Sequence, residues 1–192
     1  MDNNLLKELR DTTGAGMLDV KSALDEAGGD KEKAIELLRK KGQTKLSKKA
    51  DRVAKEGVIE SYIHAGGKIG VLVELNCETD FVSLTPDFKA LAKELALHIA
   101  ASNPLYVNIS DIPAEVIEKE KEIYREQFAG KAEMADKIIE GKLSKFYEDT
   151  CLMEQAFFRD PALKVADHIS NAVAKMGEKV VVSRFTRYVL GN

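Results

Sequence analysis

The spacing of apolar residues changes part-way along the chain, and this change most narrows the folds that the sequence can adopt. In the first part, apolar residues recur with the period of a helix face, at Met17, Val20 and Leu24. Further on they alternate with other residues, as along a strand, at Val71, Val73 and Leu75. A strongly basic run separates the two patterns. The sequence therefore predicts an all-helical unit followed by a unit that contains a sheet.

The first unit is predicted to hold three short helices. Gly14 ends the first helix, a Gly-Gly pair ends the second, and Asp30 is a good N-cap for the third. Gly42 stands where a helix C-terminus favours a residue that tolerates positive φ. We therefore expect a separate helical domain over residues 1–42. A basic linker, partly helical, is expected over 43–56, and a larger α+β domain over 57–192.

The larger domain is predicted to contain a small antiparallel sheet. Strand patterns at 58–65 and 69–76 flank a Gly-Gly turn that is typical of a β-hairpin. A third strand pattern, rich in β-branched and aromatic residues, covers 180–190.

Helices are predicted between these strands. Thr85 followed by a proline is typical of a helix start. A helical hairpin is expected at about 113–148, with Gly130 and Met134 at its turn and inner face. The Asp160-Pro pair predicts the start of a last helix, which Gly177 ends. The fold class expected is α+β.

The composition indicates a globular chain with reduced thiols. Apolar residues make up 44% and charged residues 32% of the 192 residues, a balance unlike that of disordered or collagen-like chains. Cys77 and Cys151 are too few for a disulfide scaffold. The first residues lack the apolar stretch of a secretory leader, and no long apolar run predicts a membrane span. We therefore expect a cytoplasmic protein.

The basic run has two interpretations. Residues 39–55 carry eight basic side chains and one acid, a net charge of +7 within a chain of net charge −3. Such a run is typical of a solvated linker and also of an RNA-binding patch. No aromatic residue lies within it to stack on bases. The linker is favoured, so no direct nucleic-acid binding is expected, and RNA binding remains the alternative.

A search for catalytic motifs offers one weak candidate. P-loop, HExxH, GxSxG and CxxC patterns are absent from the sequence, and the histidines and cysteines lack metal-ligand spacing. Cys77 with His64 as its base is the best enzyme candidate, although a thiol at the end of a buried strand is more often inert packing. His98 and His168 are expected to be hydrogen-bonded histidines in or beside the core.

The segment that follows the second strand pattern is unusual. A carboxylate and a large aromatic, Asp80 and Phe81, stand together at the junction with the next helix, where side chains commonly project outward. In one interpretation Asp80 caps a helix and Phe81 belongs to the core. In the other, both face a partner. The residue pattern alone leaves both open.

Two long motifs relate the chain to a known family. The first consists of KELR at 7–10, TGAGM at 13–17 and KSAL at 21–24. The second is GVLVELNCETDFV at 70–82, followed by HIAA at 98–101. In these motifs, and over nearly its whole length, the chain resembles the bacterial translation elongation factor Ts family, in the short form that has a single core.

The resemblance implies a function without catalytic chemistry. Members of this family are nucleotide-exchange factors that promote GDP release from elongation factor Tu; they are not enzymes and use no cofactor or metal. The first domain is expected to have a ubiquitin-associated-like fold. Short members act as homodimers, so a homodimer is expected here.

The resemblance also implies the residues that contact elongation factor Tu. The exchange wedge that disturbs the partner's Mg²⁺ and phosphate site would be Thr79, Asp80, Phe81 and Val82. The first domain would contact the partner through Lys7, Arg10, Met17 and Leu18. A weaker expectation concerns His64, which lies in a stretch resembling one that touches a second partner domain in longer members.

Overall fold

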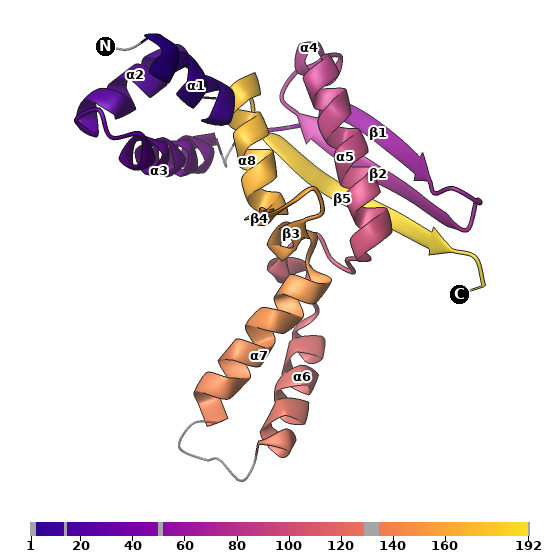
Figure 1. Cartoon of the computed structure of the whole chain (residues 1–192). Coiled ribbons are helices and arrows are strands. Elements are labelled where there is room, and N and C mark those ends of the chain that lie inside the picture. The colour runs from indigo at the N-terminus through magenta and orange to yellow at the C-terminus, as the bar shows by residue number, and fades with distance from the viewer. Residues whose placement is uncertain (1–2, 14, 50–51, 129–134, 192) are drawn as a thin grey trace.

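The structure is a computed structural model of the whole chain, and it describes residues 3–13, 15–49, 52–128 and 135–191. Three residues with predicted roles lie outside the described residues: Gly14, predicted to end the first helix, Gly130, predicted at the turn of the helical hairpin, and Met134, predicted on its inner face. The described part consists of an N-terminal helical unit and a mixed α+β unit, as predicted (Figure 1). Among its helices, none has both the length and the apolar character that crossing a membrane requires.

The N-terminal unit contains three helices: α1 (Asn3–Thr13), α2 (Met17–Glu26) and α3 (Lys31–Lys49). They enclose their own small core, in which Leu9, Val20 and Leu24 are buried. Met17 begins the predicted apolar stripe of α2 but is 44% exposed, so the stripe faces the core only from Val20 onward.

The third helix is longer than predicted. Asp30 caps its start, because the carboxylate accepts hydrogen bonds from the backbone N–H of Glu32 and Lys33 at 3.0 and 3.1 Å. The helix end predicted at Gly42 is wrong, since α3 continues to Lys49. One glycine within a helix costs only about 1 kcal/mol, and most of its neighbours are good helix formers such as lysine, glutamine and leucine.

The sheet has three antiparallel strands in the order β1-β2-β5: β1 (Glu56–Ile63), β2 (Ile69–Cys77) and β5 (Val180–Val189). Gly66 and Gly67 both adopt positive φ in the turn between β1 and β2, as the Gly-Gly signal predicted. Alternate residues of β2, from Val71 to Cys77, are buried on one face. The predicted sheet is therefore confirmed.

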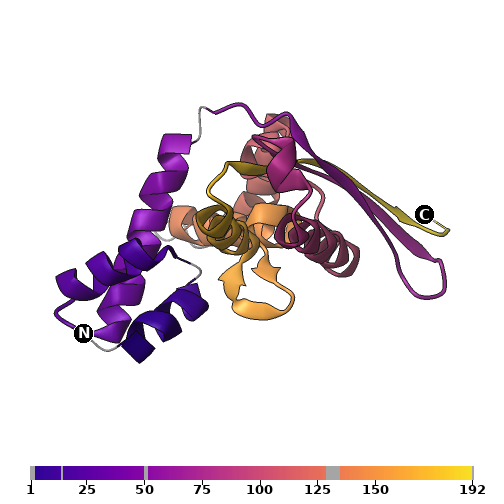
Figure 2. The same ribbon diagram turned by 90° about the horizontal axis from the view of Figure 1, so that it is seen from above.

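Helices cover one face of the sheet. α5 (Pro86–Ser102) packs on β1 and β2, and α8 (Val165–Met176) packs beside α5 (Figure 2). Thr85 caps α5 as predicted, because its hydroxyl accepts the N–H of Phe88. On the other face of the sheet, large apolar side chains remain exposed.

The remaining elements extend the α+β unit away from the sheet. α6 (Ala114–Gln127) and α7 (Ala135–Thr150) form the predicted helical hairpin, which projects from the body of the molecule (Figure 1). A small β-hairpin follows, made of β3 (Ala156–Phe157) and β4 (Asp160–Lys164).

The predicted start of the last helix is wrong. Asp160 and Pro161 lie in β4, and α8 begins only at Val165, although Gly177 ends it as predicted. The Asp160 carboxylate accepts the N–H of Ala162 at 3.2 Å, a local bond typical of turns as well as of helix starts. The short two-stranded hairpin tolerates the proline because it has free edges.

Candidate partner-binding site

The segment between β2 and α5 forms a single helical turn, α4 (Asp80–Ser83), at the end of the molecule opposite the α6–α7 hairpin (Figure 1). Phe81 is 80% exposed, so the interpretation of Phe81 as core is wrong. Asp80 is exposed beside it, and the N-cap position of α4 belongs to Thr79 rather than Asp80. The turn thus presents an aromatic ring and a carboxylate to solvent.

The opposite side of α4 faces inward and fixes the turn. Val82 packs against the main core, and Ser83 is buried with its hydroxyl donating to the carbonyl of Asp80 at 2.7 Å. The hydroxyl of Thr85 donates to the carbonyl of Val82 at 2.7 Å and thereby joins α4 to the start of α5. Leu84, 66% exposed, extends the apolar surface next to Phe81 and was not among the predicted contacts.

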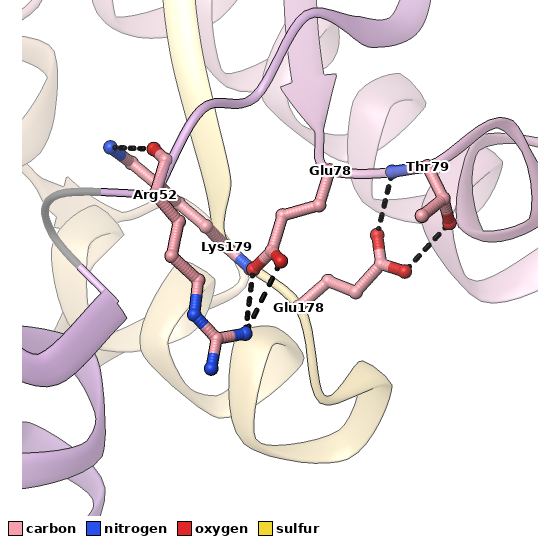
Figure 3. Close-up of polar contacts among 5 residues, drawn as sticks. All are labelled: Arg52, Glu78, Thr79, Glu178 and Lys179. Carbon is pink, nitrogen blue, oxygen red and sulfur yellow. Dashed lines mark hydrogen bonds and ion pairs between the residues drawn. The ribbon is translucent and has the colours of Figure 1, made fainter.

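Two glutamates bind the base of α4 to the turn between α8 and β5 (Figure 3). The carboxylate of Glu178 accepts the backbone N–H of Thr79 at 3.0 Å and its hydroxyl at 2.6 Å. The carboxylate of Glu78 accepts the backbone N–H of Lys179 at 2.7 Å. Both oxygens of the same carboxylate contact the guanidinium of Arg52. Glu178 was not predicted to belong to the site, because it lies 99 residues from Thr79 and no local pattern marks it.

Cys77 serves as packing rather than as a nucleophile. Its thiol is buried at the end of β2 and donates to the carbonyl of Thr79 at 3.1 Å. Burial, and next the negative charge of Glu178, raise the pKa of the Cys77 thiol. His64 follows the far end of the β1–β2 ladder, about 25 Å away at the usual rise per residue. The thiol–imidazole pair of the enzyme alternative is therefore not formed.

His64 lies at the outer tip of the β1–β2 hairpin. It is exposed, and its Nδ1 is 3.0 Å from the hydroxyl of Tyr62. This tip points away from the N-terminal unit (Figure 2). The structure thus places His64, which belongs to the α+β unit, on a different side of the molecule from the contacts predicted in the N-terminal unit.

The four predicted contacts of the N-terminal unit are all exposed. Lys7 and Arg10 are three residues apart on α1 and so share one face. Met17 and Leu18 begin α2, and Leu18 is 84% exposed. α1 packs on α2, so the unit presents two positive charges and two apolar side chains on adjoining helices.

The two other histidines are structural, as predicted. His98 is fully buried on α5; its Nδ1 accepts the N–H of Phe158 at 3.3 Å and its Nε2 lies 2.9 Å from the amide oxygen of Gln155. Burial lowers the pKa of His98. His168 is half-buried against the carboxylate of Glu94 at 3.0 Å. Among the described residues, no group of three or more His, Cys, Asp or Glu is placed to hold a metal ion.

Comparisons with known proteins relate the sequence of this chain to one family. A family model described as "Elongation factor TS" matches residues 17–192. The chain is 59% identical to elongation factor Ts of Fervidobacterium nodosum over 190 residues, which cover 97% of this chain and 96% of the relative. It is 58% identical to elongation factor Ts of Thermotoga petrophila, over 98% of this chain and 95% of that protein. With elongation factor Ts of Carboxydothermus hydrogenoformans the identity is 52%, covering 98% and 88%.

Proposed function

The chain belongs to the elongation factor Ts family, and we propose that it is a cytoplasmic guanine-nucleotide exchange factor that promotes GDP release from elongation factor Tu during protein synthesis. The observation that carries the mechanism is Phe81, an aromatic side chain 80% exposed on a turn whose other side is fixed to the core. Exposed aromatic residues of this kind are typical of binding hot spots.

In this mechanism α4 acts as a wedge. Phe81 enters the GTPase domain of elongation factor Tu, and burial of its ring there gains roughly 1.5–3 kcal/mol. This free energy stabilises a conformation of the GTPase domain in which the inserted ring holds its elements apart. Asp80 brings a carboxylate close to the site where the partner holds the GDP phosphates and Mg²⁺, and so weakens that site electrostatically. Thr79 and Val82 complete the turn.

The exchange factor needs no bond-making step of its own. It binds the nucleotide-free partner more tightly than the GDP-bound partner. By thermodynamic reciprocity, the exchange factor then weakens the binding of GDP to elongation factor Tu by the same factor. The site therefore requires shape, an aromatic ring and a charge, and no catalytic residue or cofactor.

The N-terminal unit serves as a second attachment point on the same GTPase domain. Lys7 and Arg10 offer positive charges, and Met17 and Leu18 offer exposed apolar surface. Attachment there raises the effective concentration of the wedge at its target. His64 is a further, weaker contact, directed to another domain of the partner.

We propose further that the chain forms a homodimer through the outer face of the sheet. Ile59, Leu72 and Tyr188 come from three different strands, share this uncovered face and are each at least half exposed. A second copy would cover them by symmetric sheet-on-sheet packing. Light scattering at micromolar concentration is expected to give about twice 21.2 kDa. A monomeric mass for the wild-type chain would contradict the dimer.

Release of labelled GDP from elongation factor Tu tests the function itself. A substoichiometric amount of this chain is expected to accelerate release many-fold, because an exchange factor turns over. The RNA-binding alternative predicts instead no acceleration, together with binding to bare RNA that weakens steeply with salt.

A further inference from the structure

We propose that Glu178 is a positioning residue for α4: its carboxylate fixes the direction in which Phe81 is presented, as one half of a reciprocal clamp with Glu78. This inference rests on the proposed exchange function. It adds a requirement that lies outside the wedge motif and in a part of the chain 99 residues away.

The clamp is reciprocal in its geometry. Glu178 accepts the backbone N–H of Thr79, the residue that follows Glu78. Glu78 accepts the backbone N–H of Lys179, the residue that follows Glu178. Each segment therefore supplies one carboxylate and one backbone donor to the other, and the two segments are locked in a single register (Figure 3).

The position of the clamp explains why it controls α4. The N-terminal N–H groups of a helix have no partner within the helix, and a single turn is too short to be stable alone. Thr79, the N-cap residue, donates both its N–H and its hydroxyl to Glu178, the latter at 2.6 Å. Hydrogen bonds to a carboxylate are stronger than neutral ones and restrict direction. Phe81 follows only two residues later, so its orientation depends on this anchor.

The clamp is separate from what holds the sheet together. Cys77 of β2 pairs with Val180 of β5 immediately beside it, and the buried core lies beneath that pair. Glu78 and Glu178 are only partly buried. Loss of Glu178 is therefore expected to release α4 locally and leave the rest of the unit folded.

Arg52 connects the clamp to the chain that leads from α3. Its guanidinium contacts both oxygens of Glu78, at 3.3 and 3.2 Å, and its carbonyl accepts the side-chain amine of Lys179 at 2.9 Å. The clamp thus also holds the described segment between the N-terminal unit and β1 next to the base of α4.

The test compares Glu178→Ala with a matched control, Glu118→Ala. Glu118 also accepts a short bond, from Lys121 at 2.6 Å, but lies on α6 at the other end of the molecule. We expect Glu178→Ala to slow catalysed GDP release by about tenfold or more, because misplacing an interacting group is costly. Its Tm should stay within about 3 °C of wild type. Glu118→Ala should exchange normally. Glu178→Gln, which keeps one acceptor oxygen and the side-chain shape, should recover part of the rate.

The double variant with Phe81→Ala distinguishes positioning from a general defect. If Glu178 acts through Phe81, adding Glu178→Ala to Phe81→Ala slows exchange no further. The inference is overturned if Glu178→Ala exchanges like wild type, or if it slows the Phe81→Ala protein by the full factor. If Glu178→Ala unfolds, the isosteric Glu178→Gln replaces it in both measurements. The inference is then overturned if Glu178→Gln accelerates GDP release as wild type does, or if adding Glu178→Gln to Phe81→Ala slows release by the full factor. A Phe81→Ala protein that exchanges at the wild-type rate refutes the wedge itself, which is a separate result.

Discussion

Phe81 and Phe88 are seven residues apart and have opposite surroundings. Phe81, on α4, is 80% exposed, whereas Phe88, in the first turn of α5, is completely buried. The helix α5 buries its apolar stripe against the sheet, and that burial explains why Phe88 is aromatic. The ring of Phe81 is exposed, so the free energy of folding does not explain why position 81 is aromatic. We propose from this difference that the buried side chains of α5 serve stability, whereas the exposed side chains of α4 serve binding.

The largest expected effect separates the two phenylalanines by stability. Phe88→Ala should lower the free energy of unfolding by about 3–5 kcal/mol, because it leaves a cavity in the core. Phe81→Ala should change it by less than about 0.5 kcal/mol, as is usual for an exposed side chain. Urea denaturation of both variants and wild type measures this. Equal losses in the two variants would remove the distinction between α4 and α5.

An intermediate effect is expected where the same contrast recurs in the N-terminal unit. Replacing exposed Met17 and Leu18 together by alanine should weaken binding to nucleotide-free elongation factor Tu by about tenfold, or about 1.4 kcal/mol, with Tm unchanged. Val20→Ala is the matched control on the same helix, since Val20 is buried; it should lower stability instead. Titration calorimetry gives the affinities. Unchanged affinity in the double variant would reject docking through these residues.

The smallest expected effect is a pH dependence of the free energy of unfolding, which arises from a buried histidine of α5. Burial lowers the pKa of His98, so the unfolded chain takes up a proton at this residue more readily than the folded chain. The free energy of unfolding should therefore decrease as pH falls below about 6.5, the ordinary histidine value. Thermal unfolding at several pH values between 8 and 5 tests this. A His98→Gln protein should show a shallower pH dependence; an identical slope would exclude His98 as its source.

Much of the fold could be predicted because its signals are local. Alternation located β1 and β2, and the Thr85-Pro86 pair located the start of α5. Local signals failed where they fit two structures: Gly42 lies inside α3, and Asp160-Pro161 begins a strand rather than a helix.

The candidate site was harder to predict because it depends on distant contacts. The motif located Asp80 and Phe81, but residue type cannot distinguish a buried ring from an exposed one. Glu178 belongs to the site only because β5 pairs with β2 and brings the turn before it next to Thr79. That pairing joins residues about 100 positions apart, where sequence periodicity carries no information.

We expect Phe81 to act on the partner and not on the fold, and one experiment separates these two roles. Release of labelled GDP from elongation factor Tu is measured with substoichiometric wild-type chain and with Phe81→Ala, at a temperature at which circular dichroism shows both to be folded. Loss of a hot-spot side chain should slow the catalysed release by roughly tenfold to a hundredfold. If folded Phe81→Ala accelerates GDP release from elongation factor Tu as much as wild type does, Phe81 is not the group that acts on the partner.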